Sequence, residues 1–252
     1  MPTISPQELA VEIFQADQQM EREFQHFFNF PPDGANFGGE IDPIGTPQHF
    51  LDEQLWTPVT LSTGALFELD FWEHPAKELV LQTMWELAES IRNGERLDAL
   101  TDAFGSSYTE RHIPTYLSGR YNQNRDANGG RYVFSSTPKT AEGALSLAVT
   151  GVVGTGETQV TEIKKDQLRN IQVVGGVCLF DYMRGGLQEV EDKTGVVMQP
   201  ALTVETAIEG LMDAGLINND FGWSVLEWAA TPPGEPFPPE SRIRPDGTPH
   251  VQ

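Results

Sequence analysis

Two short groups of acidic and histidine side chains have spacings that could hold a metal ion. The first is Asp70-Phe-Trp-Glu-His74 and the second is Glu23-x-x-His26. Apolar and acidic residues alternate over 67–71, which predicts a strand with Asp70 and His74 on one face. A Glu-x-x-His pair belongs to metal sites of helical bundles that need a second copy, and this sequence has one copy only. We therefore expect no metal and no other cofactor.

The segment Asp70–His74 also resembles the Asp-x-Trp-Glu-His motif of iron and manganese superoxide dismutases, in which the aspartate and the histidine bind the metal. The resemblance implies metal ligands at Asp70 and His74. Pro75-Ala-Lys follows here, where that family has aromatic residues. We interpret Glu73 instead as an acidic residue beside the positive end of a helix that begins at Pro75.

A glycine-rich segment, Gly151-Val-Val-Gly-Thr-Gly-Glu-Thr158, has the spacing of a phosphate-binding P-loop except at one position. Glu157 stands where that loop has a lysine that reaches the β- and γ-phosphates. Since a carboxylate repels phosphate, the sequence predicts no P-loop nucleotide site. It predicts a flexible turn between two helices.

Nucleophilic catalysis has no clear candidate in the sequence. Cys178 is the single cysteine, and its apolar neighbours Val177 and Leu179 predict a buried, inert thiol with a raised pKa. No Gly-x-Ser-x-Gly motif occurs. These features favour a protein that is not an enzyme.

The charge balance limits the partners. The net charge is −21, and residues 1–110 contain 20 of the 37 acidic residues but only 4 of the 16 basic ones. Nucleic-acid binding is not expected, because it depends on Lys and Arg replacing counterions. No apolar run approaches the length of a membrane span, and no signal peptide is visible. We expect a cytoplasmic or virion protein without membrane contact.

The periodicity of apolar residues predicts a mainly helical α+β fold with a small antiparallel β-hairpin over 59–72 and an extended Pro-rich C-terminal arm. Ser5 and Glu8 have capping-box spacing, and Gly94 and Gly215 are expected helix stops. Residues 1–230 are expected to form one domain, with a long packed loop at 31–58 and a tail at 231–252. Residues 177–183 and 221–228 fit either a helix or a strand. The predicted helices are 5–28, 75–93, 95–104, 137–149, 161–174 and 203–214, a strand is expected at 131–135, and 106–131 is expected to be irregular.

The tail carries the functional prediction. Seven of its 22 residues are proline, so its backbone is already restricted and can lie on another subunit at modest entropic cost. We therefore predict a structural or assembly subunit of a large particle, such as a virion neck, tail or capsid component, that binds other protein subunits and forms an oligomer. One alternative is a mainly helical metal-dependent or small-molecule enzyme with its site near Asp70 and His74, and another is an acidic module that binds a basic partner. The predicted interaction residues are Phe37, Phe50, Trp56, Pro232, Pro233, Phe237, Pro238, Pro239 and Ile243.

Overall fold

A computed structural model describes residues 4–19, 28–29, 59–61, 75–103, 112–124, 133–135 and 140–231. Its centre is a parallel sheet of five strands in the order β4-β3-β5-β6-β7. A separate two-stranded antiparallel sheet joins β1 to β2. The strands are β1 (Phe28–Asn29), β2 (Thr60–Leu61), β3 (Ala99–Asp102), β4 (Phe134–Ser135), β5 (Leu145–Val153), β6 (Gln172–Asp181) and β7 (Met198–Thr203).

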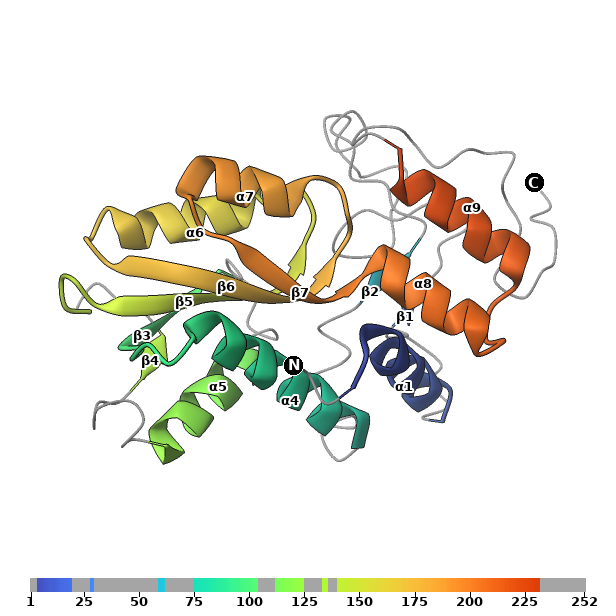
Figure 1. Ribbon diagram of the computed structural model, residues 1–252, viewed down its shortest axis with the longest axis horizontal. Coiled ribbons are helices and arrows are strands. Elements are labelled where there is room, and N and C mark those ends of the chain that lie inside the picture. Colours follow the sequence, from blue (N-terminus) through green and yellow to red (C-terminus); the bar gives the residue numbers. More distant parts are fainter. Residues whose placement is uncertain are drawn as a thin grey trace, which may run out of the picture.

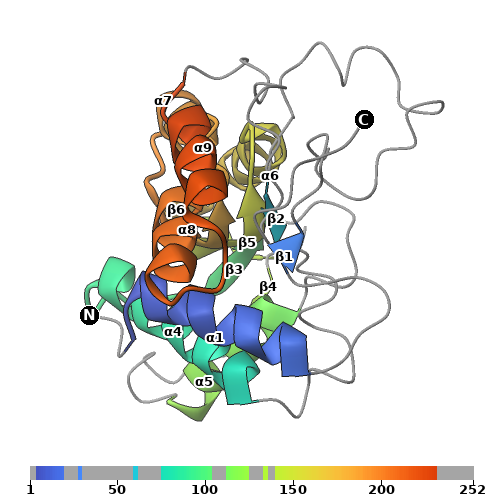
Figure 2. The same cartoon turned by 90° about the vertical axis from the view of Figure 1, so that its right-hand side faces the viewer.

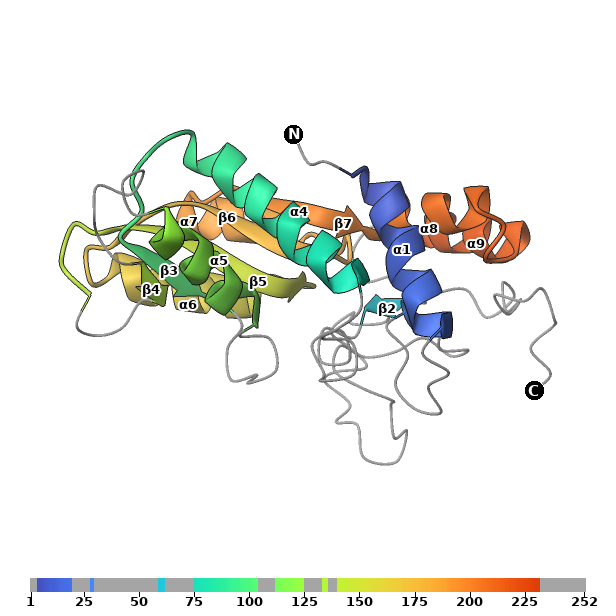
Figure 3. The same cartoon turned by 90° about the horizontal axis from the view of Figure 1, so that it is seen from below.

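Helices cover both faces of the parallel sheet, as Figure 1 shows. One face carries α6 and α7, and the other carries α4 and α5, which lie nearest the viewer in Figure 3. Three further helices pack together beside the sheet, with α8 between α1 and α9 (Figure 2). The helices are α1 (Pro6–Gln19), α4 (Pro75–Arg92), α5 (His112–Gln123), α6 (Glu157–Gln167), α7 (Gly186–Thr194), α8 (Val204–Asp213) and α9 (Asn219–Ala229).

Each central strand is apolar toward both helical layers. Leu147 and Val149 of β5 pack with the core that includes α1, α4, α5, α8 and α9, whereas Ala148 between them packs under α6 and α7. In β6, Cys178 likewise faces the α6–α7 layer. Since both faces of such a strand are buried, its sequence shows no alternation of apolar and polar residues.

The predicted fold class, α+β and mainly helical, is wrong. The fold is α/β, because the segment predicted as a helix at 95–104 contains the parallel strand β3, and the one at 137–149 includes the first five residues of β5. The helix predicted at 161–174 begins earlier and ends at Gln167, and residues 172–174 belong to β6. The segment predicted to be irregular contains α5. The predicted hairpin partner of β2 and the Pro-rich arm at 232–252 lie outside the described residues, and the observed partner of β2 is β1.

Several predictions of helix ends are confirmed. The Ser5 N–H donates to the Glu8 carboxylate at 3.0 Å, and the Glu8 N–H donates to the Ser5 hydroxyl at 3.2 Å. These hydrogen bonds form the expected capping box. The pKa of Glu8 is lowered by the bonds that the Ser5 N–H and the Ser5 hydroxyl donate to its carboxylate. The helix after Pro75 ends before Gly94, and α8 ends before Gly215. Both glycines have positive φ angles, +81° and +67°, which is the left-handed helix stop that glycine favours.

Candidate functional site

The order of the strands singles out one place along the carboxyl edge of the sheet. From β3 the chain passes through α5 to β4 on one side, and then returns across β3 to β5 on the other side. The helix after β3 lies on one face of the sheet and α6, which follows β5, lies on the opposite face (Figure 1). The ends of β3 and β5 therefore form a topological switch point, where open α/β sheets bind their ligands.

The glycine-rich segment lies at this switch point. Gly151 belongs to β5, and Gly154 and Gly156 form the loop that leads into α6. Gly156 is the N-cap of α6, with a φ of 81°, and no side chain caps the helix. The first backbone N–H groups of a helix have no intrahelical acceptor, and they carry the positive end of the helix dipole. This arrangement suits an anion, and in particular a phosphate group. The predicted turn between two helices is instead a strand-to-helix loop.

A second glycine turn supports this loop from the side. Gly185 caps α7 in the same left-handed conformation, with a φ of 82°, and also without a side-chain cap. A Cβ built on Gly156 would lie 2.4 Å from the carbonyl oxygen of Gly186, and one built on Gly186 would lie 2.2 Å from that of Gly154. The two turns thus touch backbone to backbone. Only residues without a side chain permit this contact.

Uncharged polar side chains join the two strands at the switch point. Gln159, in the first turn of α6, donates through Nε2 to the carbonyl oxygens of Ala103 at 3.3 Å and Val152 at 3.2 Å, and to the Thr150 hydroxyl at 3.1 Å. Thr150 donates to the Ala103 carbonyl at 3.3 Å. Gln159 is only 6% exposed and Thr150 only 1%. The loop is therefore tied both to the end of β3 and to its own strand.

The end of β6 contributes a buried carboxylate. Asp181 pairs with Val153 in the sheet, and its carboxylate accepts the N–H of Met183 at 3.0 Å. Burial raises the pKa of Asp181 to about 6, an effect that the bond from Met183 partly opposes. Next along the turn, the Arg184 guanidinium lies 4.5 Å from the ring centre of Trp228, which connects the turn to α9.

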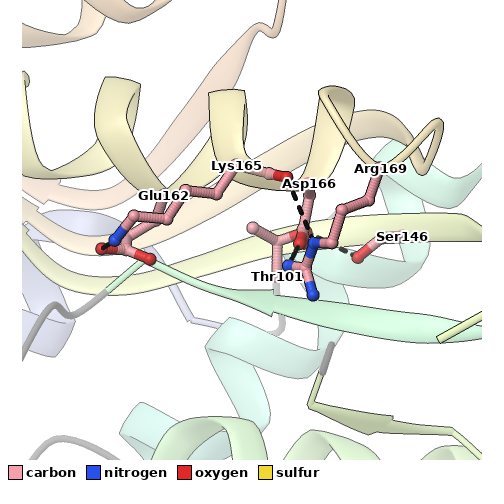
Figure 4. Close-up of polar contacts among 6 residues, drawn as sticks. All are labelled: Thr101, Ser146, Glu162, Lys165, Asp166 and Arg169. Carbon is pink, nitrogen blue, oxygen red and sulfur yellow. Dashed lines mark hydrogen bonds and ion pairs between the residues drawn. The ribbon is translucent and has the colours of Figure 1, made fainter. Parts of the chain in front are cut away.

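Farther from this edge, a polar cluster holds the other end of α6 against the same two strands (Figure 4). The Thr101 hydroxyl of β3 donates to the Asp166 carboxylate at 2.7 Å and lies 2.7 Å from the Ser146 hydroxyl of β5. Asp166 is 1% exposed and also forms an ion pair with Arg169. Figure 4 shows these side chains pointing toward one another between the helix and the strands, while Glu162 and Lys165 pair separately. The cluster fixes the position of α6.

No family model matches the chain, and no curated protein matches it in sequence. Several solved structures share its fold. UMP synthase from Leishmania donovani is 15% identical, with a TM-score of 0.60 over 90% of this chain and 42% of its own length. Orotate phosphoribosyltransferase from Aeropyrum pernix is 11% identical, with a TM-score of 0.56 over 81% of this chain and 99% of its own. The fold is of the phosphoribosyltransferase type. Orotate phosphoribosyltransferase from Francisella tularensis is 10% identical, with a TM-score of 0.50 over 84% of this chain and 91% of its own length.

These likenesses overturn the predicted function. The structural or assembly subunit, with a virion as its setting, is contradicted because the solved structures that share this phosphoribosyltransferase-type fold are those of enzymes. A virion location has no support, and the alternative of a mainly helical enzyme has the wrong fold. Among the described residues, no helix is long and apolar enough to cross a membrane.

The structure describes few of the residues that the sequence singled out as sites. The candidate metal ligands Glu23, His26, Asp70 and His74 lie outside the described residues. Within the described part, no group of three or more His, Cys, Asp or Glu side chains could hold a metal ion. Cys178 is fully buried, and burial raises the pKa of its thiol well above the usual value, as predicted. The interaction residues Phe37, Phe50, Trp56, Pro232, Pro233, Phe237, Pro238, Pro239 and Ile243 are likewise outside the described part.

Sequence reasoning missed Thr150, Gln159, Asp181 and Gly186 as site residues. Their significance depends on which strands are neighbours, which is not visible in the local pattern. The glycine spacing was the available signal, and placing an apolar strand before it would have turned attention to this edge.

Proposed function

We propose that the protein binds a phosphoribosyl ligand at the carboxyl edge between β3 and β5 and acts as a phosphoribosyltransferase. The observation that carries this proposal is the loop from Gly154 to Thr158. It lies at the switch point of a phosphoribosyltransferase-type fold and leads into a helix whose N-terminus no side chain caps.

The backbone of the loop supplies the chemistry for a phosphate group. The N–H groups of Glu157, Thr158 and Gln159 are the first of α6, so an anion beside them receives hydrogen bonds and the favourable end of the helix dipole. The close contact with Gly186 limits the movement of the loop, so the donors are already placed before the ligand arrives.

Glu157 opposes this binding but does not block it. Its side chain is exposed, where water screens the repulsion between two negative charges to about 1 kcal/mol at 4 Å. The pKa of Lys193 is raised mainly by its ion pair with Glu189, and Glu157 adds a smaller effect of the same sign. In a P-loop, the side chain at the position of Glu157 contacts the phosphate. In the proposed site the backbone N–H groups of α6 make this contact, so the type of the side chain at 157 matters less.

The test is a calorimetric titration of the protein with 5-phospho-α-D-ribosyl 1-diphosphate, followed by an assay for pyrophosphate release when orotate, the substrate named for the similar enzymes, is added. We expect saturable binding to the wild type and at least tenfold weaker binding to Gly156→Ala. Gly143→Ala is the matched control, because Gly143 has the same left-handed conformation (φ +75°) away from the loop. A wild-type protein that gives no binding heat at millimolar ligand would overturn the proposal. Binding without pyrophosphate release would support the proposed ligand but contradict transferase activity with orotate.

Contacts with other protein subunits stay a prediction. Light scattering on the purified protein would measure its solution mass, and a monomeric mass would contradict self-association.

A further inference from the structure

Gln159 is the one long uncharged polar side chain that α6 buries, and its contacts determine how its amide is oriented. The side chains that α6 buries are Gln159, Val160, Ile163 and Asp166. Two of the three neighbours of Nε2 are backbone carbonyls, of Ala103 and Val152, and carbonyls can only accept hydrogen bonds. The NH₂ group must therefore face the strands. The amide oxygen, Oε1, faces away from these acceptors.

This oxygen keeps its capacity to accept a hydrogen bond. Within the described part of the chain, the hydrogen bonds of the Gln159 side chain all use Nε2. The residue is 6% exposed, but Oε1 itself is not fully buried, so a ligand can reach it. Gln159 is the third residue of α6 and directly follows the loop that offers N–H donors to phosphate.

The two halves of Gln159 thus differ in function. Its nitrogen fastens the loop to the ends of β3 and β5, and its oxygen is left as an acceptor in the helical turn whose backbone groups are donors. A phosphate cannot use such an acceptor, because a phosphate ion itself accepts hydrogen bonds. A sugar hydroxyl can, since it donates one.

We propose that Gln159 is a specificity-determining residue of this site, whose Oε1 accepts a hydrogen bond from a ribose hydroxyl of the ligand. This inference rests on the proposed function, and it names the ligand group that the site reads besides the phosphate. A ligand that offers only phosphate gains nothing from Oε1. A ligand with a phosphate and a ribose uses both the loop and Gln159.

The experiment compares two ligands and three variants by calorimetry. The ligands are 5-phospho-α-D-ribosyl 1-diphosphate and inorganic pyrophosphate, which has no hydroxyl donor. Gln159→Met has a similar volume but no hydrogen bonds, and Gln159→Asn withdraws the amide by one methylene while remaining polar. Gln167→Met is the matched control, because Gln167 donates to the Thr194 carbonyl at 2.8 Å from the other end of the same helix.

We expect both Gln159 variants to weaken binding of the phosphoribosyl ligand about tenfold more than they weaken binding of pyrophosphate. Both ligands lose the anchored loop, but only the phosphoribosyl ligand also loses the hydrogen bond to Oε1. Gln167→Met should bind both ligands as the wild type does. Equal weakening for the two ligands would overturn the inference, because Gln159 would then act only by holding the loop. Unchanged binding of both ligands would also overturn it. Failure of the wild type to bind the phosphoribosyl ligand would instead remove the proposed function, and the inference with it.

Discussion

Replacing Gly156 by alanine tests the central contact of the site. Two independent effects add at this position. Its φ of 81° is unfavourable for alanine by about 1–2 kcal/mol. The new Cβ would also meet the Gly186 carbonyl oxygen at 2.4 Å, whereas Cβ contacts under 3.0 Å essentially never occur, so one of the two turns must move. Overpacking of this kind costs about 1–3 kcal/mol. We therefore expect the free energy of unfolding to fall by about 3 kcal/mol.

Two other glycines separate the two effects in urea unfolding experiments. Gly143 has a φ of +75° with nothing within 4 Å of its Cβ position, so Gly143→Ala should cost only the conformational part, about 1 kcal/mol. Gly186 lies in helical backbone, but its Cβ would meet the Gly154 carbonyl oxygen at 2.2 Å, so Gly186→Ala should cost the contact part, about 2 kcal/mol. If Gly156→Ala were no more destabilising than Gly143→Ala, the two turns would not be in backbone contact, and the reasoning about a preformed loop would fail.

Three further changes have defined outcomes. Burial raises the pKa of Asp181 to about 6, so the wild type loses stability as pH rises from about 4 to 6 and the carboxyl ionises. The free energy of unfolding of Asp181→Asn should therefore exceed that of the wild type by about 2 kcal/mol at pH 7 and by little at pH 4. A difference in urea unfolding that does not depend on pH would contradict this. Asp166→Ala should lower the free energy of unfolding by about 3 kcal/mol, because it removes the acceptor of the Thr101 hydroxyl and leaves the Arg169 guanidinium without its buried partner; a loss under about 1 kcal/mol would show that the cluster does not hold α6. Glu157→Gln should bind the phosphoribosyl ligand about three- to fivefold more tightly than the wild type at low salt, because it removes a negative charge beside the phosphate. The difference should shrink as salt is added. If the wild type bound more tightly than the variant, the phosphate would not lie beside Glu157.

Two of the three helices outside the sheet layers, α1 and α8, followed from the sequence because their information is local, whereas the segment of α9 fitted either a helix or a strand. α1 and α8 each bury one stripe, and their ends carry the expected signals, such as the Ser5–Glu8 capping box and Gly215. α4 also covers the sheet with one apolar stripe, and it ends at Arg92, just before the predicted stop at Gly94. An amphipathic stripe of period 3.6 needs no knowledge of its partner.

The strand expected at 131–135 contains β4, but β3 and β5 were predicted as helices, because burial on both faces removes the signal that marks a strand. In β5 the nine residues Leu145–Val153 include serine, alanine, threonine and glycine, and seven of them are buried whichever way they point. Such a run gives no period of 2, and its small residues fit a closely packed helix equally well. In β3 the strand has only four residues, Ala99–Asp102, which is too short for any period to be read.

The error about the strands also explains the error about the site. The segment from Gly151 to Thr158 has the same residues whether a helix or a strand precedes it, but the consequences differ. After a helix, its N–H groups would lie in an ordinary turn, and Glu157 would be the feature that excludes phosphate. After a parallel strand, the loop lies at the edge of the sheet, and its donors are the backbone of α6. The backbone can then do what a lysine does in a P-loop. The side chain of Glu157 therefore argues against a P-loop but says little about the proposed site, because the donors of the proposed site are backbone N–H groups.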